Sequence, residues 1–280
     1  MFRDITIGQY YEEQSNIHSL DPRVKLFGSV CYMIALFLAD NIIGYALAAI
    51  FLYVTIKISK VPFKFIFKGL KTIVILLLFS VIFSVIFTDG TVLLDLKLFN
   101  ITAQGLVKGI KLMARLSLMI MGMSILTYTT TPTDIADGLE KAFSPLKKIK
   151  VPVHDIAMMV SIAFRFIPIL IEETDKIMKA QMARGADFEN GGIIKKAKSM
   201  MPLIIPLVIS SIKRAMDLAM AMEARCYRGG EGRTKMKPLI YKHKDIAGYL
   251  CLFALLAVVI AGNILWDILD INIYGFITPS

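Results

Sequence analysis

Residues 246–265 read IAGYLCLFALLAVVIAGNIL and contain no charged side chain. A helix rises about 1.5 Å per residue, so this stretch is long enough to cross a hydrocarbon core of about 30 Å. Four more apolar runs precede it, at residues 26–39, 42–56, 72–87 and 112–128. The sequence therefore predicts a protein that crosses a membrane several times.

The composition agrees with a membrane protein. Hydrophobic residues make up 56% of the 280 residues and charged residues 19%, and the mean hydropathy is +0.65. Soluble domains average about 45–50% hydrophobic residues and about 25% charged residues. A chain this apolar is not intrinsically disordered. The three cysteines, Cys31, Cys226 and Cys251, form no C-x-x-C pair, which argues against a disulfide scaffold and a zinc site.

The net charge of +10 comes mostly from one segment. Residues 129–245 contain 20 Lys or Arg and 13 Asp or Glu. Basic segments beside membrane spans are cytoplasmic by the positive-inside rule. A nucleic-acid-binding face is the alternative, but half of the segment is apolar and it lacks interleaved aromatic residues. We therefore expect a lipid bilayer as the surroundings and no nucleic-acid partner.

The charges of the loops predict the topology. The linker after the second apolar run has five cations and no acid: Lys57, Lys60, Lys64, Lys68 and Lys71. It is therefore expected inside the cell, and the acidic loop with Asp89 and Asp95 outside. At the start of the fourth run, Lys108, Lys111 and Arg115 share one helix face. We expect the two lysines to extend outward and Arg115 to be buried.

Two shorter apolar runs, 156–171 and 200–212, are assigned to the cytoplasm. If both crossed the membrane, the cation-rich stretch 172–198 would lie outside, against the positive-inside rule. The prediction is an all-α membrane protein with five spans, an inside N-terminus and an outside C-terminus. Residues 1–128 form the membrane domain, 129–245 a cytoplasmic domain of about three helices, and 246–280 the last span with a short outside tail.

Two long helices are expected in the cytoplasmic domain, at residues 154–184 and 195–228. Each begins apolar and ends charged, and their ends read Ala183-Arg184-Gly185 and Ala224-Arg225-Cys226. Small neighbours expose an arginine whose planar fork can engage carboxylates in a partner's pocket. The alternative is that each arginine only complements a helix dipole, with Gly185 ending its helix. The repetition of the tripeptide favours docking.

The same segment is rich in methionine, which at helical spacing usually fills a core but also suits adaptable binding surfaces. The apolar first halves of the two long helices contain Ile167 and Ile205. These apolar stretches are too short to span a membrane, yet too large to remain exposed. We expect them to contact a partner within the membrane.

No catalytic motif is present in the sequence. It lacks G-x-x-x-x-G-K-[ST], H-E-x-x-H and G-x-S-x-G, and His18, His154 and His243 are isolated. We therefore expect no enzyme activity, no metal site and no cofactor in this chain.

The chain resembles the transmembrane T component of energy-coupling factor (ECF) transporters. The resemblance covers nearly the whole chain. Its motifs are Gly8-Gln9-Tyr10, His18-Ser19-Leu20-Asp21-Pro22-Arg23-Val24-Lys25, Leu126-Thr127, Thr130-Thr131-Pro132, Ala163-Phe164-Arg165-Phe166-Ile167-Pro168, Ala180-Gln181-Met182-Ala183-Arg184-Gly185 and Ala221-Met222-Glu223-Ala224-Arg225-Cys226-Tyr227-Arg228-Gly229. Cys226 is a departure, because the family commonly has Gly there.

The resemblance implies a coupling subunit in a prokaryotic cell membrane. In that family two cytoplasmic ABC-type ATPases, which bind ATP and Mg²⁺, hold the two motif arginines in grooves. A small membrane subunit binds the vitamin or transition-metal ion and rests on the apolar faces of the long helices. A conventional ABC permease is the main alternative, and a membrane enzyme the second. The permease predicts polar residues in several spans, whereas only the fourth run has them, and the enzyme predicts clustered Asp or His that the sequence lacks.

Overall fold

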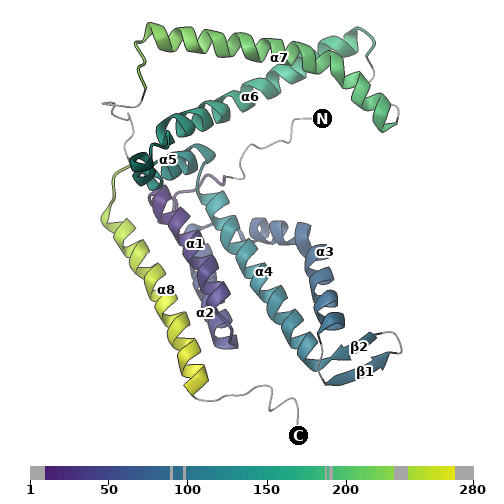
Figure 1. The fold of residues 1–280 in the computed structure, drawn as a ribbon, viewed down its shortest axis with the longest axis vertical. Helices are drawn as coiled ribbons and strands as arrows, with labels where there is room; N and C mark the ends of the chain where they lie inside the picture. Colours follow the sequence, from purple (N-terminus) through teal and green to yellow (C-terminus); the bar gives the residue numbers. More distant parts are fainter. Residues whose placement is uncertain are drawn as a thin grey trace. The chain divides into compact units, whose positions relative to one another are not determined.

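A computed structural model of the chain describes residues 10–88, 91–96, 99–186, 188, 192–229 and 239–268 (Figure 1). The chain divides into two compact units. The first comprises the described residues of 10–138 and 239–268, and the second those of 139–229.

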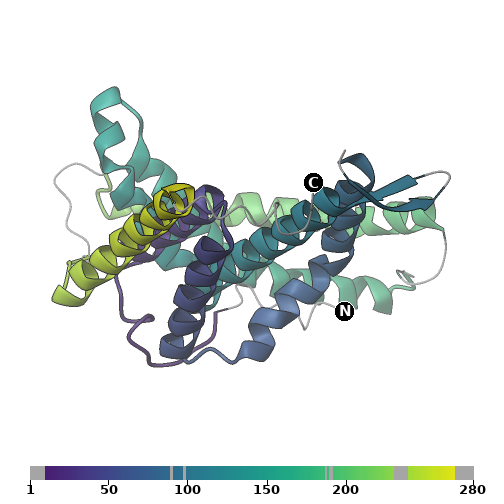
Figure 2. The same ribbon diagram turned by 90° about the horizontal axis from the view of Figure 1, so that it is seen from below.

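Five helices build the first unit: α1 (Pro22–Leu38), α2 (Ile42–Ser59), α3 (Phe63–Phe87), α4 (Ala103–Thr129) and α8 (His243–Ile268). Helix α1 packs against α4 and α8, and α3 lies along α4 (Figure 2). Side chains of α1, α2, α4 and α8 meet in one core that includes Leu36, Leu52, Ile125 and Val259. Each of the five helices overlaps one of the five apolar runs of the sequence, and they follow in the same order.

Helix α1 begins as its sequence predicts. Asp21 is the N-cap, its carboxylate accepts a hydrogen bond from the Arg23 N–H, and Pro22 occupies the first turn. At the other end, Lys111 and Arg115 of α4 donate to the carbonyl oxygens of Asp40 and Ala39, at 3.1 Å each. Arg115 was predicted to be buried and Lys111 to extend outward, but both are partly buried and share one role. Both cations bind backbone oxygens at the end of α1, which explains how cations are accommodated beside an apolar helix.

The set of possible membrane spans differs from the predicted five. Among the described residues, α2, α4, α6 (Val153–Ala183) and the part of α8 from His243 to Trp266 are long and apolar enough to cross a membrane. Helix α3 makes a fifth if its two parts, bent by 56°, form one span. Helix α1, with 17 residues, lies at the lower limit for a span. The sequence analysis placed α6 in the cytoplasm from its flanking charges, and that placement stays a prediction.

A short antiparallel hairpin was not predicted. Strands β1 (Val92–Leu96) and β2 (Phe99–Thr102) pair in the loop between α3 and α4, which is predicted to lie outside. Apart from this hairpin, the described regular structure is helical, so the all-α class holds.

Helices α6 and α7 (Ile193–Ala224) dominate the second unit. In the chain they are preceded by helix α5 (Pro132–Ala142), of which residues up to Gly138 belong to the first unit, and by a short 3-10 helix, η1 (Ser144–Ile149). The start of α5 is capped by Thr131, whose hydroxyl accepts a hydrogen bond from the Asp134 N–H at 3.2 Å. The predicted long helices at 154–184 and 195–228 are thus confirmed, with α7 ending a few residues earlier than expected.

Candidate functional site at the ends of two long helices

Helices α6 and α7 pack against each other in opposite directions (Figure 1). Arg214 of α7 forms an ion pair of 3.1 Å with Glu173 of α6. Farther along α6, the Gln181 side chain donates to the carbonyl oxygen of Pro202, near the start of α7. Residues nearer the C-terminal end of α6 therefore contact residues nearer the N-terminal end of α7, so the two helices are antiparallel.

Arg184 is the C-cap residue of α6 and is followed by glycine in the left-handed region. Gly185 has φ of +89°, a conformation that costs glycine little because it has no Cβ. Its N–H donates to Met182 O at 2.9 Å, and the Ala186 N–H donates to Gln181 O at 3.0 Å. These two bonds are those of a Schellman motif, so the chain turns sharply at the arginine.

Arg225 ends α7 with the same geometry. Cys226 has φ of +55°, its N–H donates to Glu223 O at 2.8 Å, and the Tyr227 N–H donates to Met222 O at 3.0 Å. This is a second Schellman motif, built with cysteine in the position that favours glycine. The repeated tripeptide therefore corresponds to a repeated backbone structure.

Both arginines are exposed at the ends of their helices. Ala183, Arg184 and Gly185 are exposed, and so are Ala224, Arg225 and Cys226. Within the described part of the chain, no hydrogen bond or ion pair involves either guanidinium group. The terminal carbonyl oxygens of both helices accept backbone N–H groups. The exposed forks are available to carboxylates of another protein.

The antiparallel packing separates the two arginines. Arg184 lies three residues beyond Gln181, which touches Pro202, while Arg225 follows Pro202 by 23 residues of α7. At 1.5 Å per residue the two tips are about 35 Å apart. Both arginines lie at the C-terminal ends of their helices, and because the helices are antiparallel these ends lie at opposite ends of the pair.

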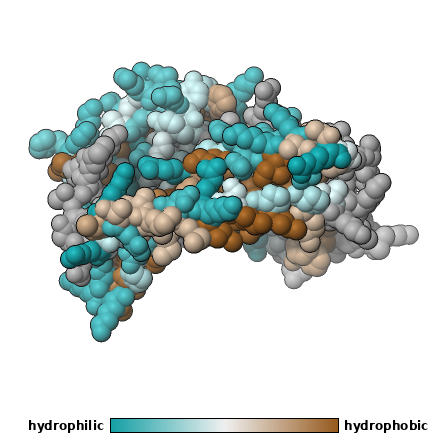
Figure 3. All heavy atoms as spheres, turned by 90° about the horizontal axis from the view of Figure 1, so that it is seen from above, coloured by the Kyte–Doolittle hydropathy of each residue, from teal (hydrophilic) through white to brown (hydrophobic). Residues whose placement is uncertain are grey.

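The apolar parts of α6 and α7 are largely uncovered in this chain. Ile205 is 57% exposed, and Ile167 is half-buried. Figure 3 shows a hydrophobic band, brown, flanked by hydrophilic side chains, teal. Many other apolar residues of the two helices are exposed: Ile156, Met159, Val160, Met182, Met200, Met201, Ile204, Val208, Ile209, Ile212, Met216 and Met220. Most of these methionines do not fill the core of the isolated chain, so of their two possible roles the binding surface is favoured.

A hollow of about 330 Å³ lies between the two helices. Apolar residues line it from both sides, among them Ile162, Phe166 and Leu170 of α6 and Leu218 and Met222 of α7. The helices thus meet incompletely, which leaves apolar surface for contacts along the pair.

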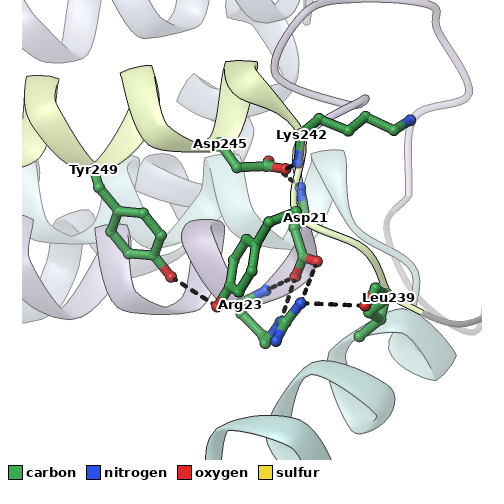
Figure 4. Close-up of polar contacts among 7 residues, drawn as sticks. Asp21, Arg23, Leu239, Lys242, Asp245 and Tyr249 are labelled. Carbon is green, nitrogen blue, oxygen red and sulfur yellow. Dashed lines mark hydrogen bonds and ion pairs between the residues drawn. The ribbon is translucent and has the colours of Figure 1, made fainter.

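A polar cluster in the first unit was not predicted as a unit (Figure 4). Asp245, 1% exposed, accepts hydrogen bonds from the N–H groups of Asp21 at 2.8 Å and Lys242 at 2.7 Å. The Arg23 guanidinium binds the Asp21 carboxylate at 2.9 Å and lies over the Tyr241 ring. Burial raises the pKa of Asp21, but the hydrogen bonds from Arg23 outweigh it, so the net effect lowers that pKa. The cluster ties the start of α1 to the start of α8; only its Asp21-Pro22-Arg23 part was visible in the sequence.

Within the described residues, no three His, Cys, Asp or Glu side chains are placed to hold a metal ion.

Comparison with known proteins identifies the family. A family model described as "Cobalt transport protein" (CbiQ) matches residues 13–236. A relative from Clostridium kluyveri, named "Energy-coupling factor transporter transmembrane protein EcfT", is 48% identical over 95% of this chain and 99% of its own length. Proteins with the same name from Ruminiclostridium cellulolyticum and Bacillus subtilis are 50% and 45% identical, over 88% and 92% of this chain and 92% and 97% of their own lengths.

The chain belongs to the family of energy-coupling factor transporter transmembrane proteins.

Membership in the EcfT family confirms the resemblance drawn from the motifs. The chain is a multi-pass membrane protein and a transmembrane component of an ECF transporter. The matched range includes both arginine motifs and the two apolar helix surfaces.

Proposed function

We propose that the chain is the coupling subunit of an ECF-type ABC importer. Two cytoplasmic ABC-type ATPases bind and hydrolyse ATP with Mg²⁺, and each receives one of the arginines, Arg184 or Arg225. A small membrane subunit binds a vitamin or other micronutrient and rests on the apolar surfaces of α6 and α7. The chain itself catalyses no reaction. Its N-terminus lies in the cytoplasm and its C-terminus outside.

The repeated arginine ends support this proposal most strongly. Two exposed C-cap arginines, each flanked by alanine and a left-handed residue, stand about 35 Å apart on one helix pair. One ATPase groove holds one helix end, so two tips this far apart fit two separate ATPases. The CbiQ and EcfT names agree with a transporter role for the chain.

The helix pair provides a mechanical link between the partners. Each arginine ends a helix of about 30 residues, and the Glu173–Arg214 ion pair joins the two helices between their ends. When ATP binding moves the ATPases together, a guanidinium fixed by two parallel hydrogen bonds carries that movement into its helix. The apolar surfaces of the same helices then shift the substrate-binding subunit.

Removal of the arginines tests the proposal. Losing one partner of a buried charge pair costs about 2–5 kcal/mol, or about 30- to 4,000-fold in affinity. Docking at two points buffers the loss of one. We expect Arg184→Ala or Arg225→Ala alone to impair uptake and only partly loosen the ATPases. The double variant is expected to release them or to uncouple ATP hydrolysis from transport, and lysine at these positions is expected to rescue poorly.

Lys176→Ala with Lys213→Ala is the matched control, because both lysines are exposed cations on the same helices away from their ends. The measurements are co-purification of the ATPases and uptake in vesicles. If the double arginine variant retains both ATPases and normal uptake, the arginines are only helix caps and the mechanism is wrong.

A charge on the apolar surface tests the contact with the substrate subunit. Ile205→Glu places a carboxylate on a surface residue, so the chain is expected to fold but to lose the substrate subunit more than the ATPases. Ile167→Glu is expected to do the same with some loss of helix packing, because Ile167 is half-buried. Ile149→Glu in η1, at a residue that is 73% exposed, is the control. Equal loss of all partners with aggregation would show that the two isoleucines serve only helix packing.

The composition of the purified complex separates the proposal from the alternative, a conventional ABC permease that forms the substrate path itself. Two ATPases and a small hydrophobic subunit are expected after detergent extraction. Transport that needs ATPases but no such subunit would support the permease.

A further inference from the structure

An apolar hollow of about 720 Å³ lies in the first unit, lined by α1, α2, α4 and α8. Helices α1 and α8 contribute both small residues (Gly28, Ser29, Ala247, Gly248, Cys251 and Ala254) and larger ones such as Leu252 and Leu255. Helix α2 contributes larger ones, including Phe51 and Val54. Leu252 and Val24 lie close beside Gly28 and Gly248, so the open volume comes from the lining as a whole and not from these two glycines.

The length of the hollow matches one leaflet of a bilayer. Its lining extends from Leu47 to Ile58 on α2, which is about 16 Å of helix. On α8 it extends from Lys244 to Val258, about 21 Å, of which the uncharged part from Ala247 onward is about 16 Å. Half of a hydrocarbon core of about 30 Å is about 15 Å. Helices α2 and α8 are both long and apolar enough to cross a membrane. The hollow therefore follows the side chains of two spans through one leaflet.

A polar hollow of about 650 Å³ adjoins one end of the apolar one. The two share Asn16, Ile58 and Lys244. The polar hollow is lined by two cations, Lys60 and Lys244, and one acid, Glu13. Its neutral polar lining residues are Tyr10, Gln14, Ser15, His18 and Ser19. The Lys244 ammonium donates to the Asn16 side chain at 3.3 Å, and within the described residues Lys60 has no ion-pair partner. Positive charge thus exceeds negative charge where the apolar hollow opens.

We propose that the two hollows together bind one anionic phospholipid. Its hydrocarbon chains occupy the apolar hollow, and its phosphate lies near Lys60 and Lys244. Lys60 belongs to the acid-free linker predicted to be cytoplasmic, and anionic lipids are enriched in the cytoplasmic leaflet. The site requires only that α2 and α8 cross the membrane and is independent of the coupling role proposed above.

The cations Lys60 and Lys244 at the mouth of the apolar hollow favour an anionic lipid over an apolar helix of a partner protein. A flexible hydrocarbon chain is much narrower and adapts to an irregular space. A free phosphate ion would leave the apolar hollow empty.

Native mass spectrometry of the full chain in detergent tests the site. We expect the chain to retain one phosphatidylglycerol in preference to phosphatidylcholine with the same hydrocarbon chains. A lysine beside an anionic lipid surface contributes about 1 kcal/mol, so Lys60→Gln with Lys244→Gln is expected to weaken phosphatidylglycerol retention about 30-fold. Lys57→Gln with Lys64→Gln removes the same charge from the same region at residues that line neither hollow, and is expected to change little.

A second variant tests the apolar part. Ala254→Phe fills the hollow and is expected to reduce the retention of both lipids, with helix content checked by circular dichroism. Inorganic phosphate is expected not to compete. Equal retention of the two lipids by the natural chain, equal loss in the control pair, or displacement by millimolar phosphate would each overturn the proposal: the first two indicate general attraction to the membrane surface, and the last an ion site.

Discussion

Cys226 shows how one residue sets the end of a functional helix. Its φ of +55° lies in the left-handed region, where a residue with a Cβ is strained by about 1–2 kcal/mol. The equivalent residue at the end of α6 is Gly185, which adopts the same region without that strain. The departure from the family motif at this position is therefore tolerated by the backbone at a cost.

Replacing Cys226 by glycine is expected to stabilise the end of α7. Cys226→Gly relieves the strain while retaining both Schellman hydrogen bonds, and the expected gain is about 1 kcal/mol, reduced by the greater freedom of glycine when unfolded. Hydrogen exchange at the amides of Cys226 and Tyr227 measures the gain directly. Cys226→Ala serves as the control, because it keeps the Cβ. Equal slowing of exchange in both variants would show that the sulfur, not the backbone, is responsible.

His18 provides a residue-scale prediction for pH. Its Nε2 donates to the carbonyl oxygen of Tyr11 at 3.0 Å, and Nδ1 lies 2.7 Å from the Ser15 hydroxyl. The neutral ring satisfies both bonds, with Nδ1 as acceptor. Burial lowers the pKa of His18 below its ordinary value near 6.5, and the charge of Lys25 acts in the same direction.

A lowered histidine pKa means that the unfolded chain binds the proton more readily than the folded one. The stabilising contribution of neutral His18 is thus present above about pH 6.5 and is lost as the pH falls toward the folded pKa. We expect thermal unfolding of the detergent-solubilised chain to shift to lower temperature between pH 7.5 and 5.5, and His18→Gln to reduce that shift. An unchanged pH dependence in the variant would assign it to other groups.

At the scale of elements, the contact of α1 with α4 depends on glycine. A Cβ on Gly122 of α4 would lie 2.5 Å from the Tyr32 ring of α1, a separation that side chains do not adopt. Tyr32 itself is 4% exposed and belongs to the core of the first unit. The two helices approach this closely because one of them lacks a side chain at the contact.

Gly122→Ala is accordingly expected to destabilise the first unit by about 1–3 kcal/mol through overpacking. Gly262→Ala in α8 is the matched control, because nothing lies within 4 Å of its added Cβ and alanine favours a helix. Thermal stability in detergent distinguishes them: a lower midpoint is expected for Gly122→Ala and an unchanged or higher one for Gly262→Ala. If both variants unfold at the same temperature as the natural chain, the contact of α1 with α4 does not depend on glycine at position 122.

At the scale of the whole molecule, the side of the membrane occupied by α6 and α7 is a prediction that accessibility can test. The basic excess of residues 129–245 predicts that Cys226 lies in the cytoplasm. Cys226 is exposed and Cys31 is buried, so Cys251→Ala leaves one accessible thiol. A membrane-impermeant thiol reagent is expected to label it in inside-out vesicles and not in intact cells. Labelling in intact cells would contradict the five-span topology and favour α6 as a span.

The sequence by itself determined the local features of this protein. Apolar runs located α2, α4 and α8, Asp21-Pro22 and Thr131-Pro132 marked helix starts, and the repeated tripeptides located both arginine ends. These features depend on hydropathy and on hydrogen bonds between near neighbours, which are written in short stretches of sequence. The motifs were specific enough to indicate the family that the comparisons then showed.

Only the tertiary structure decided which residues and helices lie next to each other. The antiparallel packing that sets Arg184 about 35 Å from Arg225, and the bond between Asp21 and Asp245, join residues far apart in the chain. The same holds for the hollow between α2 and α8. Such contacts depend on how side chains of distant helices fit together, and similar apolar patterns are compatible with several packings. The sequence could therefore name the residues of the site but not their arrangement.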